Sequence, residues 1–81
     1  MHKVAEQQAS LRHLPSVDSL LQEPLTQGML VDFGRPLVVE ALRAALDEAR
    51  ELLLSGAVNQ TPSATELISN ARTGMAELLA P

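Results

Sequence analysis

The chain has 81 residues, of which 46% are hydrophobic and 20% charged, and its formal net charge is −4. A chain this short forms one small domain with a single core and no deep cleft. It has no cysteine, which excludes disulfides, thiolate zinc sites and cysteine nucleophiles. Phe33 is its one aromatic residue, so the chain cannot build a stacking platform for single-stranded nucleic acid. Its acidic balance argues against general binding of nucleic acid.

No apolar run approaches the roughly 20 residues that a membrane-spanning helix needs. Residues 1–12 are polar and lack the hydrophobic region of a signal peptide. We therefore expect no membrane partner and a cytoplasmic location.

The sequence predicts helices throughout, because no segment alternates apolar and polar residues with the period of two that a strand shows. Residues 1–14 favour helix by composition but place few apolar residues at helical spacing, which predicts a weakly helical segment. Residues 15–81 are expected to form the helical domain proper. Ser16 is predicted to cap a short helix. The apolar stripe of this helix is Val17, Leu20 and Leu21.

Pro24 is suited to open the next helix, since a proline in the first turn loses no hydrogen bond. Gly34 is predicted to end that helix in the left-handed conformation that glycine adopts without a Cβ penalty. The apolar side of this helix is expected to consist of Leu25, Met29, Leu30 and Phe33.

Residues 36–55 predict one long central helix, with Pro36 in its first turn and Gly56 at its end. One continuous arc of this helix is apolar. The arc consists of Val38, Val39, Ala41, Leu42, Ala45, Leu46, Ala49, Leu52 and Leu53.

Ser63 and Glu66 form an S-x-x-E capping box for a last helix. The apolar stripe of that helix is Leu67, Ile68, Ala71, Met75, Leu78 and Leu79. The elements together predict an all-α fold, a small bundle of about four helices. The chain ends at Pro81 without a closing cap, which is typical of a domain cut from a longer protein.

The sequence offers no catalytic constellation. His2 and His13 stand in the weakly helical segment with no carboxylate at ligand spacing, so surface histidines are favoured over a metal site. The serines and threonines fall at cap or linker positions, and Lys3 has no buried pocket to activate it. We therefore predict no catalytic residue, no metal ligand and no cofactor site in this chain.

The arginines are placed more regularly. Arg43 and Arg50 are seven residues apart on one flank of the apolar arc, and Glu40 and Asp47 lie at helix-neighbour spacing from them. The pattern alone favours a ladder of surface ion pairs, Glu40–Arg43, Arg43–Asp47 and Asp47–Arg50, over a ligand site. Five arginines against one lysine nevertheless suit bidentate contact with phosphate.

Two more arginines are candidates for the same flank. Arg35 lies in the turn before the long helix and extends the flank if the turn projects it that way. Arg72 borders the apolar stripe of the last helix and joins the flank if the two helices pack side by side.

Two segments resemble a known family. Residues 11–21 (LRHLPSVDSLL) contain a Leu-Pro-x-Val-Asp-x-Leu-Leu motif, and residues 33–51 (FGRPLVVEALRAALDEARE) contain an aromatic-Gly turn followed by a Val-Val-Glu-x-Leu-Arg helix. In this order and at this distance, the two motifs are similar to the N-terminal domain of bacterial selenocysteine synthase, the L-seryl-tRNA(Sec) selenium transferase. The resemblance covers about half of the chain.

The resemblance implies a larger enzyme related to fold-type-I pyridoxal phosphate proteins. Such an enzyme converts seryl-tRNA(Sec) to selenocysteinyl-tRNA(Sec) and works as a homo-oligomeric ring in the bacterial cytoplasm. Pyridoxal phosphate is implied for the catalytic domain that would follow, not for this segment. The small N-terminal domain of the family recognises the D-arm of tRNA(Sec), so the resemblance implies tRNA(Sec) as the partner of this chain.

The RNA-contact candidates are Arg43 and Arg50, which match the family motif, together with Arg35, Arg12 and Arg72. The alternative is a helical protein–protein or oligomerisation module with no RNA contact, because the apolar arc of the long helix is wider than a minimal bundle face needs. We expect the isolated domain to be a monomer.

Overall fold

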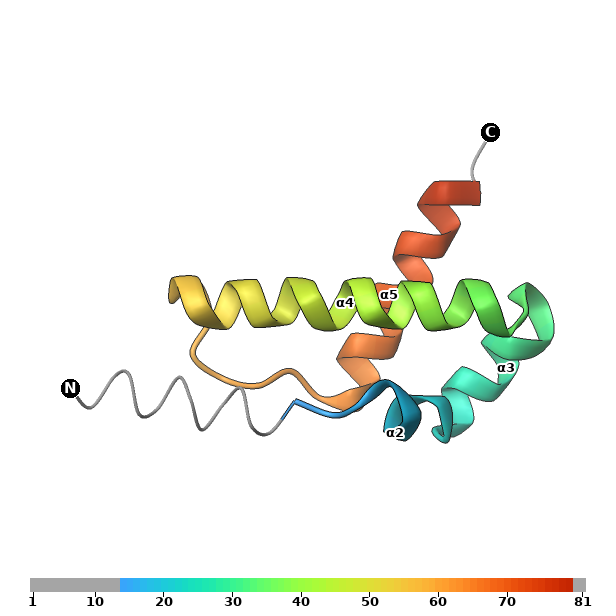
Figure 1. Ribbon diagram of the computed structural model, residues 1–81, viewed down its shortest axis with the longest axis horizontal. Coiled ribbons are helices and arrows are strands. Elements are labelled where there is room, and N and C mark those ends of the chain that lie inside the picture. Colours follow the sequence, from blue (N-terminus) through green and yellow to red (C-terminus); the bar gives the residue numbers. More distant parts are fainter. Residues whose placement is uncertain (1–13, 80–81) are drawn as a thin grey trace.

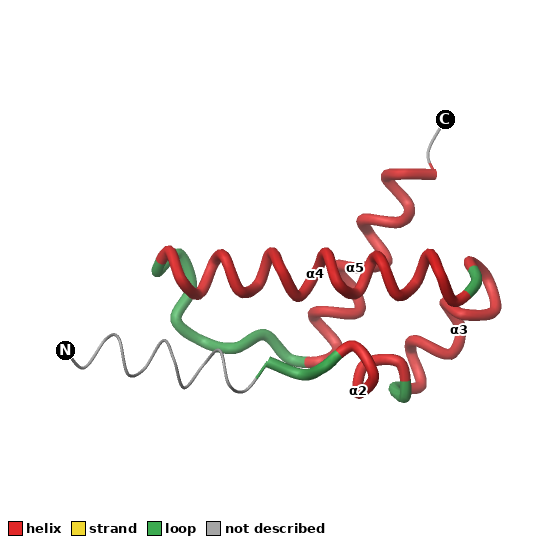
Figure 2. The backbone as a smooth tube through the Cα atoms, viewed as in Figure 1, coloured by secondary structure: helices red, strands yellow, loops and turns green. Residues whose placement is uncertain are grey.

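The computed structural model describes residues 14–79, and the predicted weak helix before them therefore lies outside the described residues. Within this range there are four helices and no strand (Figure 2). The helices are α2 (Val17–Leu21), α3 (Pro24–Phe33), α4 (Arg35–Ser55) and α5 (Ala64–Leu79). The predicted all-α bundle with one long central helix is confirmed.

Helix α4 organises the bundle. Helix α5 crosses it and makes the most extensive packing with it, and α2 and α3 also pack against α4 (Figure 1). Residues 56–63 run back along α4 to the start of α5 (Figure 1). All three other helices therefore depend on α4 for a surface to pack on.

Two helices begin at serine caps, as the sequence predicts. The hydroxyl of Ser16 accepts a hydrogen bond of 3.1 Å from the backbone N–H of Ser19 at the start of α2. The hydroxyl of Ser63 accepts one of 3.1 Å from the N–H of Glu66 at the start of α5. Each cap satisfies a backbone donor that has no partner within the helix.

A single glycine joins α3 to α4. The N–H of Gly34 donates to the carbonyl of Leu30 at 3.0 Å, and its own carbonyl accepts from the N–H of Val38 at 3.2 Å. Its φ is positive as predicted, but the pair φ 86°, ψ 153° lies outside the left-handed helical region. Because Gly34 serves both helices, α4 begins at Arg35, one residue before the predicted start.

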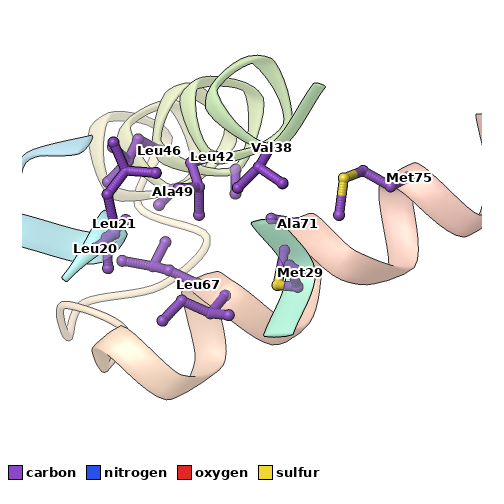
Figure 3. Packing of buried hydrophobic residues seen from close by; sticks show 12 residues of the cluster. Leu20, Leu21, Met29, Val38, Leu42, Leu46, Ala49, Leu67, Ala71 and Met75 are labelled. Atoms are coloured by element: carbon purple, nitrogen blue, oxygen red, sulfur yellow. The ribbon is translucent and has the colours of Figure 1, made fainter. Parts of the chain in front are cut away.

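The core is built from aliphatic side chains of all four helices (Figure 3). Helix α4 contributes its predicted arc, although Leu52 of that arc is exposed. The stripe of α5 is buried only as far as Met75, and Leu78 and Leu79 are 77% and 58% exposed. The last turns of α5 extend beyond α4 (Figure 1), so the stripe continues where none of the other helices covers it.

The buried side of α3 differs from the prediction at one position. Leu25 is exposed, and Thr26 is buried in its place, next to the predicted Met29. The Thr26 hydroxyl donates a 2.6 Å hydrogen bond to the carbonyl of Leu20, and the side-chain amide of Gln27 donates one of 2.8 Å to the carbonyl of Leu21. These two bonds tie the start of α3 to the end of α2, so a polar residue occupies a core position because it holds the turn between them.

We predict that Gly34→Ala destabilises the domain by about 1–3 kcal/mol, because only glycine adopts this backbone conformation without strain. A Cβ there meets no atom within 4 Å, so crowding does not add to the loss. Gly28→Ala is the matched control, since it lies inside α3 with equally open space. It should stabilise the domain by about 0.5–1 kcal/mol. Urea and thermal unfolding measure both, and equal midpoints for the two variants would contradict the strain argument.

We predict that Thr26→Val destabilises the domain by about 1 kcal/mol, the typical net value of one buried hydrogen bond. The loss stays moderate because the Leu20 carbonyl also accepts from the backbone N–H of Glu23 at 3.1 Å. Thr65→Val, an exposed position in α5, is the control and should change stability by less than about 0.5 kcal/mol. The same unfolding curves test this, and a wild-type midpoint for Thr26→Val would show that the hydroxyl is dispensable.

Candidate nucleic-acid interface

Two arginines stand on one exposed edge of α4. Arg43 and Arg50 lie two helical turns apart, which is about 10 Å along the axis, and we call this pair the arginine edge. The residues that precede them, Leu42 and Ala49, are buried in the core. Packing of α4 therefore fixes which way the edge faces, and continuous helix fixes the spacing of the Cα atoms of its two arginines along the axis.

Each arginine of the edge is paired with the acid three residues before it. Nη1 of Arg43 lies 3.8 Å from Oε1 of Glu40, and Nη1 of Arg50 donates a 3.2 Å hydrogen bond to Oδ1 of Asp47. All four side chains are between 55% and 74% exposed. Exposed pairs of this kind contribute about 0–1 kcal/mol, so both arginines remain accessible to a stronger anion.

The predicted ladder is thus confirmed in two of its three rungs. In the part of the chain that the structure describes, Arg43 pairs only with Glu40 and makes no ion pair with Asp47. Asp47 instead bonds Arg50. The edge consists of two separate pairs whose formal charges cancel, not of one continuous network.

The remaining candidates lie at three different places in the chain. Arg35 is the first residue of α4, about 12 Å along the axis from Arg43, and it is exposed. Arg72 is exposed on α5, which crosses α4 and does not run alongside it (Figure 1). Arg72 was expected to join the flank of Arg43 and Arg50 only if the two helices packed side by side, and that packing is absent. Arg12 lies outside the described residues.

Arg35 and Arg72 form no ion pair with any residue of 14–79. This difference from Arg43 and Arg50 was not among the expectations from the sequence. The signal was present in the sequence, because within its own helix neither has an acid three or four residues away. The cations with no acidic partner in this range therefore lie away from the edge, one at the start of α4 and one on α5.

A groove of about 300 Å³ runs along the junction of α4 and α5. Its lining is mostly small or aliphatic and includes Leu37, Ala41, Gly74 and Leu78, together with the acids Glu40 and Glu48. No group of three or more metal-ligating side chains occurs in residues 14–79. Nor is any helix in this range both long and apolar enough to cross a membrane.

Residues 11–50 match the family model described as "Selenocysteine synthase N terminal". This stretch contains α2, α3 and most of α4, including the arginine edge and both of its acids.

Among curated proteins, the chain is 42% identical over 65 residues, 80% of its length, to the L-seryl-tRNA(Sec) selenium transferase of Methylocella silvestris. It is 40% identical over 52 residues, 64% of its length, to the protein of the same name from Hyphomonas neptunium. It spans only 14% and 11% of the lengths of these two relatives. No solved structure matches the chain. The family match and these identities show that the chain belongs to the selenocysteine synthase family, as its N-terminal domain.

Proposed function

We propose that this domain binds tRNA(Sec) for a bacterial selenocysteine synthase and recognises the D-arm of that tRNA. The observation that carries the proposal is the arginine edge, which is exposed, has fixed spacing and lies inside the family-matched stretch. The names of the relatives support it, because each describes an enzyme that acts on L-seryl-tRNA(Sec).

The chemistry of the surface suits a double-stranded arm. The chain has one aromatic residue, Phe33, which is partly buried against the core, so base stacking contributes little. Double-stranded RNA is recognised mainly through its shape, phosphates and 2′-hydroxyls. Guanidinium groups suit that task because they contact phosphate oxygens in a bidentate manner. In this proposal Arg43 and Arg50 hold the phosphates, and Arg35, Arg12 and Arg72 add contacts at the periphery.

We assign the catalytic step to the rest of the enzyme. The single lysine of the sequence, Lys3, precedes the described residues, so residues 14–79 contain no lysine to hold pyridoxal phosphate as a Schiff base. In this proposal a separate catalytic domain holds the cofactor and converts seryl-tRNA(Sec) to selenocysteinyl-tRNA(Sec) in the cytoplasm. A homo-oligomeric ring would present several copies of this domain to its tRNA partners.

We predict that Arg43→Ala and Arg50→Ala each weaken binding of the 81-residue chain to tRNA(Sec) by about fivefold, equivalent to about 1 kcal/mol. Each should also lower the slope of log K against log salt concentration by about 1, since one phosphate contact is lost. Fluorescence anisotropy with labelled tRNA(Sec), repeated at several salt concentrations, measures both quantities.

Two controls accompany this titration. Ala44→Ser changes an exposed residue of α4 without changing charge and should bind as the wild type does. A parallel titration with tRNA(Ser) reports discrimination between the two tRNAs. Wild-type affinity and slope in both arginine variants would refute the assignment of the arginine edge to RNA binding.

The exposed end of α5 supports a second candidate, a protein–protein module. Leu78 and Leu79 are exposed beside the groove between α4 and α5, and Leu78 also lines that groove. Apolar side chains gathered on a surface often mark a contact with another protein or domain.

We expect the isolated chain to be a monomer, because a patch of two exposed leucines is too small to hold two copies together. Sedimentation equilibrium over a hundredfold range of concentration tests this. A concentration-dependent dimer that Leu78→Ser and Leu79→Ser abolish would favour the protein–protein module instead. Thr73→Ser, an exposed change on the same helix, is the control.

A further inference from the structure

The two arginines proposed to hold phosphate are the two that already hold an anion. Among residues 14–79 the recorded ion pairs are Arg43–Glu40 and Arg50–Asp47. Both acids are more than two-thirds exposed, so neither pair is held in place by burial. The acids stand at i−3 from their arginines, so each guanidinium group has a carboxylate beside it with which a phosphate must compete.

A carboxylate and a phosphate compete for the same donors. Both accept from the fork of N–H groups on a guanidinium, so Arg50, which hydrogen-bonds Asp47, offers fewer donors to RNA. Arg43 and Glu40 are 3.8 Å apart and attract each other as charges without a hydrogen bond. Each pair is also formally neutral, and the chain as a whole carries a charge of −4. Such an edge exerts little long-range attraction on a polyanion, and binding requires that phosphates displace the acids at short range.

We propose that Glu40 and Asp47 act as built-in competitors for phosphate, lowering the affinity of the arginine edge for RNA in general. This inference rests on the proposed tRNA-binding function. An RNA overcomes the competition by placing phosphates at both arginines, whose separation α4 fixes. Phosphates that reach only one arginine displace one acid and leave the other pair closed. The two acids are thus specificity-determining residues that do not themselves bind the ligand.

Removing the competitor tests the idea directly. Glu40→Gln and Asp47→Asn keep the size of each side chain and remove its charge. Each should raise the affinity for tRNA(Sec) by about two- to fivefold, the range that corresponds to an exposed ion pair. For a generic duplex RNA of the same length the gain should be larger, so discrimination between the two RNAs should fall. An equal gain for both RNAs would show that the acids do not determine specificity.

Glu51→Gln is the matched control. Glu51 is an exposed acid on the same helix and makes no ion pair with any described residue. Its replacement changes the net charge by the same amount. The gain in affinity should be smaller than for the two paired acids, because Glu51 forms no ion pair that a phosphate would have to displace. An equal gain in all three variants would mean that net charge alone is at work and would overturn the proposal.

A double-mutant cycle then localises the effect. In an Arg43→Ala background, Glu40→Gln should no longer raise affinity, whereas in an Arg50→Ala background it should still do so. The reciprocal result is expected for Asp47→Asn. A gain from Glu40→Gln that persists without Arg43 would contradict competition within the pair.

The outcomes separate this inference from the function on which it rests. If both arginine variants bind as the wild type does, the proposed RNA-binding edge is wrong and the inference falls with it. If the arginine variants lose affinity while Glu40→Gln and Asp47→Asn gain no more than Glu51→Gln, the edge binds RNA and the competition alone is refuted. Circular dichroism of each variant establishes that the helices are intact.

Discussion

The burial of one face of α4 supports everything else in this domain. That face packs against α2, α3 and α5 at once, and no other helix contacts all three of its neighbours as extensively. Aliphatic side chains supply the packing, since the chain has neither a disulfide nor an aromatic cluster to add to it. The same burial sets the orientation of the opposite surface, because a helix that cannot rotate about its axis presents its exposed residues in one direction only.

The helices were predictable because their signals are local. Apolar periodicity, serine caps and prolines in first turns lie within a few residues of the boundaries that they mark. The exchange of Leu25 for Thr26 as the buried residue of α3 shows where hydrophobicity misleads. Counting back from Phe33 at i−3, i−4 and i−7 gives Leu30, Met29 and Thr26, so the periodicity was in the sequence. Leu25 is also at helical spacing, i−4 from Met29 and i−8 from Phe33, so periodicity did not decide between the two positions. The hydrogen bond of the Thr26 hydroxyl to the Leu20 carbonyl accompanies the burial of Thr26.

The candidate site could also be predicted only in part from the sequence. The pairs at i−3 in α4 follow from helix geometry alone, and both are present. The position of Arg72 relative to that edge depends on how α5 crosses α4, and periodicity carries no information about a crossing angle. The missing third rung has a related cause. Asp47 stands between two arginines at permitted spacings, and side-chain conformation decides which of them it bonds.

The joint at Gly34 has a consequence for how this family can vary in length. One residue ends α3 and begins α4, so this junction has no loop to absorb an added or deleted residue. An insertion there would turn one helix by about 100° relative to the other and move its apolar face out of the core. The connector over 56–63 makes no such demand, and most of its residues are exposed. Length differences between relatives, or an inserted tag, are therefore best accommodated between α4 and α5.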